Sequence, residues 1–171
     1  MGPPLVISSD GLVLREWTDS DVPRMVELFD EPDVARWTPL ESPFDSGAAT
    51  RYLERARTGR STGQSLQLAV TTDGGLPLGE VLLFTAADGT AELGYTVGAA
   101  HRGQGLAARA VRAAVEFGRE ALGLTRFVLR IEPENLPSQR VATAAGFLRT
   151  ADEPVVRLIK GRRTELETWQ R

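Results

Sequence analysis

A glycine-bearing turn between a strand pattern and a long helical pattern constrains this chain most. Residues 91–97 alternate as a strand does, and a helical pattern begins at Gly105. Glycines in such a turn let backbone N–H groups approach a ligand without interference from Cβ atoms. The first turn of the helix adds unpaired N–H groups and a partial positive charge. The turn therefore predicts a phosphate or pyrophosphate site. Its residues are Arg102, Gly103, Gln104, Gly105, Leu106 and Ala107.

Two widespread phosphate loops do not fit this turn. The run G-x-x-x-x-G-K-[ST] does not occur in the sequence, and a G-x-G-x-x-G fingerprint would need a glycine where Ala108 stands. The pattern that fits is R-x-x-G-x-A, formed by Arg102, Gly105 and Ala107. A plain glycine-rich turn before an ordinary helix gives the same short match, so the rest of the chain has to decide.

Composition limits the classes of protein. The 171 residues suit one domain over residues 1–171, and 42% hydrophobic with 25% charged residues indicates a soluble globular chain. A net charge of −3 argues against a general nucleic-acid binder, which needs a basic surface. The chain has no cysteine, and its one histidine is His101, so we expect no thiolate or histidine-rich metal site. With no signal peptide and no long apolar run, we expect a cytoplasmic protein without a membrane partner.

Strand and helix patterns follow one another along the whole chain. Strands are expected at residues 12–17, 66–71, 78–85, 91–97, 125–131, 155–160 and 165–171, and helices at 18–29, 46–59, 105–122 and 138–145. Asp73-Gly74-Gly75 and Asp88-Gly89 predict hairpins, so the three strands before the glycine turn should be antiparallel. Because a helix intervenes, strand 125–131 should lie parallel to strand 91–97.

Three sequence blocks keep a fixed order along the chain. They are Glu92-Leu93-Gly94-Tyr95 leading to the turn, Asn135-x-x-Ser138 after a strand, and Ala145-Gly146-Phe147 closing a short helix. In this order they resemble the GNAT superfamily of N-acetyltransferases, which bind acetyl-coenzyme A. With Leu12-x-Leu14-Arg15 and Asp21, the chain is most similar to the branch that acetylates ribosomal-protein amino termini. The resemblance covers roughly residues 10–171.

The resemblance implies both a fold and an activity. The fold is α/β (α+β mixed), a twisted mixed sheet, mostly antiparallel, of about six to seven strands flanked by about four helices. The sheet would splay between its fourth strand, 91–97, and its fifth, 125–131, and coenzyme A would enter there. The activity would be direct transfer of acetyl from acetyl-CoA to a primary amine in a ternary complex. The amine would belong to a protein or peptide N-terminus or to a small molecule.

The resemblance also implies contacts to coenzyme A. Backbone groups of strand 91–97 would bind the pantetheine arm, and the turn would hold the pyrophosphate with help from Arg102. Asn135 would contact the cofactor near the pantetheine, and its alternative role is a helix cap. The full set of implied contacts is Tyr95, Thr96, Val97, Arg102, Gly103, Gln104, Gly105, Leu106, Ala107, Asn135 and Ser138.

Ser138 and Glu92 are the candidate catalytic residues. By family position Ser138 would protonate the leaving thiolate, and its alternative role is an N-cap hydroxyl. Many relatives use a tyrosine for this step, where the present chain has Ala142. Glu92 is the candidate base, and its alternative role is a sheet-surface carboxylate paired with an arginine. Glu80 is a weaker candidate base, and deprotonation through water without a single base also stays open.

The acceptor side is less determined. Trp37, Phe44 and Tyr52 are candidates for the amine pocket, with core or lid packing as the alternative for two of the three. Arg36 and Arg51 would favour an anionic acceptor. Two alternative functions remain, a non-catalytic acyl-CoA-binding sensor or interaction domain and an N-acyltransferase that uses another donor, such as succinyl-CoA. A terminal hairpin leaves a homodimer open.

Overall fold

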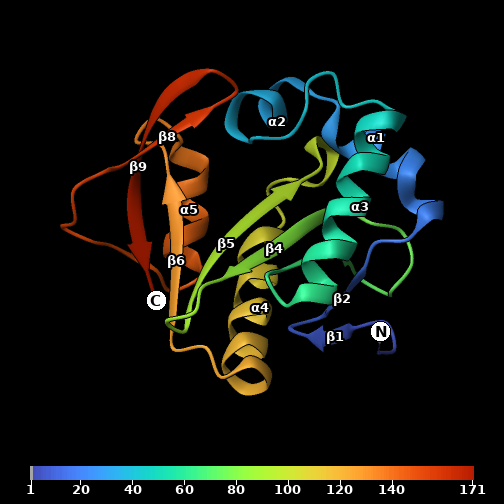
Figure 1. Cartoon of the computed structure of the whole chain (residues 1–171), viewed down its shortest axis with the longest axis horizontal. Coiled ribbons are helices and arrows are strands. Elements are labelled where there is room, and N and C mark those ends of the chain that lie inside the picture. The colour runs from blue at the N-terminus through green and yellow to red at the C-terminus, as the bar shows by residue number, and fades with distance from the viewer. Residues whose placement is uncertain (1) are drawn as a thin grey trace.

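The computed structural model describes residues 2–171 as a nine-stranded mixed sheet with helices on both faces (Figure 1). The strands are β1 (Val6–Ser9), β2 (Leu12–Glu16), β3 (Ser65–Thr71), β4 (Gly79–Thr85), β5 (Thr90–Val97), β6 (Arg126–Ile131), β7 (Leu148–Arg149), β8 (Val155–Ile159) and β9 (Arg162–Gln170). The α-helices are α1 (Val22–Phe29), α2 (Pro32–Trp37), α3 (Ser46–Thr62), α4 (Leu106–Leu122) and α5 (Leu136–Ala144). None of these helices is both long enough and apolar enough to cross a membrane.

The strand order confirms the predicted mixed sheet. It runs β1-β2-β3-β4-β5-β6-β9-β7, with β8 pairing β9. All neighbours are antiparallel except β5 and β6, which are parallel as expected from the helix between them. The sheet is therefore of the predicted class, with its one parallel pair at the predicted place.

The predicted numbers of strands and helices were too low. β1 and β7 add two strands, so the predicted fourth and fifth strands are β5 and β6. β1 turns into β2 through Asp10 and Gly11, both with positive φ, which is the conformation of a tight hairpin. The fifth helix is α2, only six residues long, which begins at Pro32, where a missing N–H costs nothing.

One helix begins where it was predicted and another begins earlier. α3 begins at Ser46, and Asp45 caps it, because its side chain accepts from the backbone N–H of Ala48. Asn135 caps α5 by accepting from the N–H of Ser138, so this helix begins at Leu136, earlier than expected. The cap role that was the alternative for Asn135 is therefore observed.

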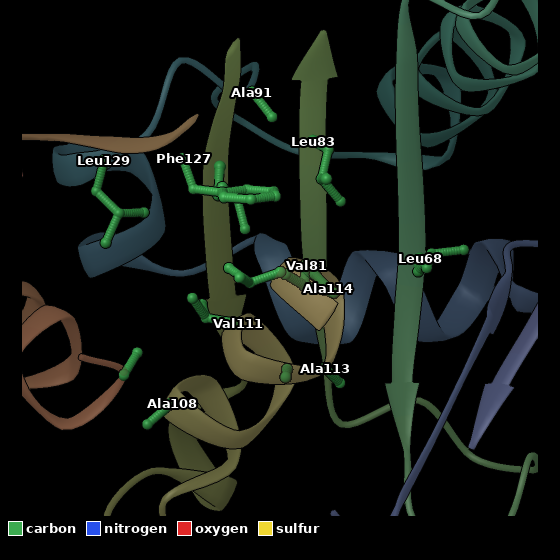
Figure 2. Close-up of a cluster of buried hydrophobic side chains, with 14 of the residues drawn as sticks. Leu68, Val81, Leu83, Ala91, Ala108, Val111, Ala113, Ala114, Phe127 and Leu129 are labelled. Atoms are coloured by element: carbon green, nitrogen blue, oxygen red, sulfur yellow. The ribbon is translucent and has the colours of Figure 1, made fainter. Parts of the chain in front are cut away.

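Each face of the sheet carries its own hydrophobic core. On one face, α4 packs against strands β3 to β6, and Figure 2 shows Val111 and Ala114 of this helix among side chains of the strands. On the other face, α1 and α3 enclose a core that includes Trp17, Phe29 and Phe44. Alternation along the strands separates the two cores, since Leu68 joins the first and its neighbour Ala69 joins the second. β5 contributes to the first core only, through Ala91 and Leu93.

Candidate functional site

β5 and β6 are joined over only part of their length. Their parallel register runs from Thr90 opposite Arg126 to Leu93 opposite Leu129 and then stops. Beyond it, Gly94–Val97 pairs only with β4, whereas the end of β6 pairs only with β9. Figure 1 shows the two strands diverging toward their C-terminal ends. The splay predicted between these strands is therefore confirmed.

The glycine turn follows this open end of β5. Gly103 and Gly105 have φ of +78° and +73°, a conformation that side chains disfavour, and a Cβ on either would meet no atom within 4 Å. Within residues 2–171, no hydrogen bond uses the backbone N–H groups from Gly103 to Ala108. These amides lie at the N-terminus of α4, where the helix dipole adds positive potential. The turn therefore has the free donors and the open space that an anion needs.

Ser138 and Tyr95 meet across the splay. The Tyr95 Oη lies 2.5 Å from the Ser138 Oγ and 2.9 Å from the Ser138 carbonyl oxygen. Asn135 fills the cap position of α5, so the Ser138 hydroxyl is not used as a cap. Ala142, where many relatives have a tyrosine, is fully buried in the first core. The phenol that contacts Ser138 is that of Tyr95, on β5.

Arg102 lies beside the turn but its guanidinium is already engaged. Its Nη1 donates to Asp33 at 3.0 Å, its Nη2 pairs with Glu31, and its Nε donates to the Val97 carbonyl at 3.1 Å. An anion at the turn would compete with the two carboxylates for this cation. Arg102 thereby links the turn to α2 and the residue preceding it.

His101 lies next to the turn and faces α1. Its Nε2 is 3.0 Å from the Arg24 Nη2. A guanidinium only donates, so the Nε2 is the accepting atom of this hydrogen bond. This contact gives His101 a structural partner on α1.

Glu92 is bound by an arginine of the β8–β9 hairpin. Its two carboxylate oxygens accept from the Arg157 Nη1 and Nη2 at 2.6 and 2.8 Å. The Nε of Arg130 lies 3.9 Å away. Such a bidentate pair fixes the carboxylate and occupies both of its oxygens. The geometry matches the paired surface carboxylate that was the alternative role for Glu92.

Glu80 is the most deeply buried carboxyl group described, at 2% exposure. It lies in register with Thr96 of β5 and accepts from the Tyr52 Oη at 2.5 Å and the Trp17 Nε1 at 2.8 Å. Burial raises the pKa of Glu80 to about 7, although both hydrogen bonds act in the opposite direction. Burial, together with the Glu80 charge, raises the pKa of Tyr52 well above its usual value. Glu80 therefore titrates near neutral pH inside the second core.

The three aromatic candidates for the amine pocket differ in their surroundings and exposure. Phe44 and Tyr52 are buried in the second core, where Phe44 packs edge-on against Phe29 and Tyr52. Trp37 is partly exposed at the end of α2, with the Arg36 guanidinium 3.9 Å from the centre of its ring. Phe44 and Tyr52 thus have the packing role that was the alternative for two of the three.

Sequence reasoning missed a polar connection between α2 and the β8–β9 hairpin. Glu132, at the end of β6, accepts from Arg36 of α2 and from Arg162 of β9. Lys160 adds a hydrogen bond to the Ala35 carbonyl at 2.9 Å. These partners are between 30 and 125 residues apart in the chain, so spacing gave no signal for them. Within residues 2–171, no three acidic or histidine side chains gather where they could hold a metal ion.

Known proteins with this arrangement identify the family. The acetyltransferase (GNAT) domain profile matches residues 11–148. An uncharacterized N-acetyltransferase of Bacillus licheniformis is 25% identical over 142 residues, which is 81% of this chain and 80% of that protein.

Solved structures show the same fold over the whole chain. A putative ribosomal-protein-serine acetyltransferase from Vibrio cholerae superposes with a TM-score of 0.85 at 24% identity, covering 100% of this chain and 99% of that one. Mycobacterium smegmatis RimJ, solved in complex with CoA-disulfide, superposes with a TM-score of 0.79 at 19% identity, covering 98% and 86%. Since the family profile spans most of the chain and the fold agrees throughout, the protein belongs to the GNAT family of N-acetyltransferases.

Proposed function

We propose that the protein transfers an acetyl group from acetyl-CoA to a primary amine. One observation carries the proposal: the free amides from Gly103 to Ala108 adjoin the unpaired edge of Gly94–Val97. A diphosphate requires several N–H donors, and an extended amide-containing arm requires a free strand edge. Both requirements are met on one continuous stretch of chain. RimJ, which shares the fold, was solved with a CoA disulfide.

The proposed contacts are those of the backbone. The amides of the turn hold the pyrophosphate, and main-chain groups of Tyr95, Thr96 and Val97 hold the pantetheine arm. Arg102 supplements the turn when it exchanges its carboxylate partners for phosphate oxygens. Asn135 shapes this site as the cap of α5, which places Ser138 at the splay.

The reaction needs few side chains. The amine lone pair attacks the thioester carbon, the C–N bond forms, and the C–S bond breaks with its electron pair going to sulfur. One proton leaves the nitrogen and one arrives at the sulfur. Ser138 is the proposed hydrogen-bond donor to the departing sulfur. Glu92 stays a candidate base, although the amine would have to compete with Arg157 for its carboxylate.

The acceptor is proposed to be a peptide or protein amino terminus or a small primary amine. The first class is motivated by the Vibrio cholerae structure, a putative ribosomal-protein-serine acetyltransferase. The exposed cations Arg36, Lys160 and Arg162 lie on α2 and the β8–β9 hairpin. They favour an acceptor with acidic residues near its amine, because such an acceptor would meet several positive charges.

Two measurements test the proposal in sequence. Calorimetric titration should show acetyl-CoA binding at one site per chain. Release of the coenzyme A thiol is then followed with a panel of small amines and peptides, including peptides with serine or alanine first and acidic residues next. Acetyl, propionyl and succinyl donors are compared in the same assay, with acetyl expected to be fastest. Absence of any binding heat at millimolar acetyl-CoA would overturn the proposal.

A further inference from the structure

The open half of β5 carries one side chain that reaches the opposite wall of the splay. Tyr95 comes two residues after the last paired residue, Leu93, and its hydroxyl reaches Ser138 in the first turn of α5. Its main chain is fixed on the other side by pairing with Val81 of β4. The ring packs against the first core. The position of the phenol is therefore set by the sheet and the core together.

Counting donors and acceptors limits what this contact can do. A phenol has one hydrogen to donate, and both of its contacts are to Ser138. If the phenol donates to the Ser138 carbonyl, the serine hydroxyl donates to the phenol oxygen. The role proposed below needs the phenol hydrogen to turn from the Ser138 carbonyl, to which it donates at 2.9 Å, to the Ser138 Oγ at 2.5 Å. The serine hydrogen is then free to point at an atom in the splay. The direction of the serine hydroxyl therefore depends on Tyr95.

The phenol stays a donor at working pH. Burial raises the pKa of Tyr95 to about 12, although its hydrogen bond with Ser138 acts in the opposite direction. The Ser138 hydroxyl is also free for this role, because Asn135 caps the helix in its place. A hydrogen bond donated to a hydroxyl oxygen strengthens the one that the same hydroxyl donates onward.

We propose that Tyr95 is a positioning residue for Ser138. Its hydroxyl directs and polarises the Ser138 hydroxyl, which donates a hydrogen bond to the departing sulfur of coenzyme A. The inference rests on the proposed function and deepens it. No proton leaves Tyr95 in this scheme, so the phenol is unchanged at the end of each turnover. The hydroxyl missing at Ala142 is replaced by a two-residue arrangement whose members come from opposite walls of the splay.

The test compares Tyr95→Phe, Ser138→Ala and the double variant. Tyr95→Phe should lower kcat by about 10- to 100-fold and leave the Kd for acetyl-CoA within about threefold. The double variant should be no slower than Ser138→Ala, because the phenol acts only through the serine. Thr71→Val is the matched control: it also removes a buried hydroxyl, one that donates to the Val13 carbonyl, and it should leave kcat unchanged.

The outcomes separate the two proposals. Wild-type protein that neither binds acetyl-CoA nor releases thiol overturns the proposed function. An active wild type with a slow Ser138→Ala and an unimpaired Tyr95→Phe overturns only the role of Tyr95. Additive effects in the double variant, or lost acetyl-CoA binding in Tyr95→Phe, overturn it as well.

A second pair of variants tests the same role if the Tyr95→Phe protein does not fold. Gln and Met have similar length, but only Gln can donate a hydrogen bond toward Ser138. Tyr95→Gln should therefore turn over several times faster than Tyr95→Met at equal acetyl-CoA binding. Equal rates would contradict the positioning role.

Discussion

The two halves of β5 differ although they belong to one strand. In the closed half, Thr90–Leu93, every residue pairs with β6 and Ala91–Leu93 also pair with β4, and Ala91 and Leu93 are buried. Gly94–Val97 is paired on one edge only, and all four of its residues are partly exposed. The closed half contributes Ala91 and Leu93 to the first core, and the open half leads into a turn whose amides are free.

This difference shows where the fold can leave hydrogen-bonding groups unused. Unpaired backbone groups destabilise a structure when they are buried, so they need water or a ligand. The neighbouring closed half supplies the rigidity that the open half lacks. Stability and ligand binding should therefore respond to different substitutions along the same strand and its partner.

The largest expected effect lies in β6, where it pairs with the closed half. Phe127 is fully buried, pairs with Ala91 and packs against Gly118 of α4. Phe127→Ala should lower the free energy of unfolding by about 3–5 kcal/mol, measured by urea denaturation. Where the variant is still folded, its Kd for acetyl-CoA should stay within about threefold of wild type. Val97→Ala, in the open half, is the comparison and should cost about 1 kcal/mol or less. Similar losses of unfolding free energy in Phe127→Ala and Val97→Ala would contradict the difference between the two halves of β5.

The next effect concerns Glu80 of β4, which lies opposite Thr96 in the open half of β5. Its folded pKa, about 7, is above the unfolded value, so its contribution to stability is complete below about pH 4.5 and is lost as the pH rises through 7. The unfolding free energy of wild type minus that of Glu80→Gln should therefore fall by about 3 kcal/mol between pH 4.5 and 8. A difference that is constant with pH would show that Glu80 does not titrate in this range.

Two glycines at opposite ends of α4 test the turn itself. Gly105 and Gly123 both have positive φ, and a Cβ on either meets no atom within 4 Å. Gly105→Ala and Gly123→Ala should therefore each cost about 1 kcal/mol of stability through backbone strain. Only Gly105→Ala should weaken acetyl-CoA binding, by about 10- to 100-fold, because its methyl group stands among the free amides. Equal affinity in the two variants would place the diphosphate elsewhere.

The smallest effect is expected at Glu92, in the closed half. Its partly exposed pair with Arg157 should contribute about 1 kcal/mol or less to stability. Because Glu92 binds the β8–β9 hairpin through Arg157, the substitution Glu92→Gln should change the rate of thiol release by less than about threefold. A loss of more than about 100-fold with unchanged acetyl-CoA binding would instead identify Glu92 as the base.

Much of the architecture could be predicted because local signals agree with the final packing. Turn glycines predicted the antiparallel strands β3 to β5, and the helical pattern after Gly105 predicted the parallel pairing of β5 with β6. β1 was missed although Asp10-Gly11 is a hairpin signal, and α2 was missed although Pro32 often opens a helix. These short elements are stabilised mainly by their neighbours, so their own sequences are weak indicators.

The candidate site was predicted less evenly. Backbone features followed from the glycines, because a positive φ is a local property. Side-chain partners did not follow: the contacts of Arg102 with Glu31, of Glu92 with Arg157 and of Tyr95 with Ser138 join segments that are distant in sequence. Each depends on how the sheet and helices come together, which residue spacing does not encode.

The placement of β9 has a consequence for synthesis on the ribosome. β6 is translated before its antiparallel partner, residues 167–170, which emerges roughly forty residues later. In that interval one edge of β6 is an open template for other nascent chains. A pause in translation just after Ile131 would lengthen this exposure, whereas rapid completion of the last hairpin would end it.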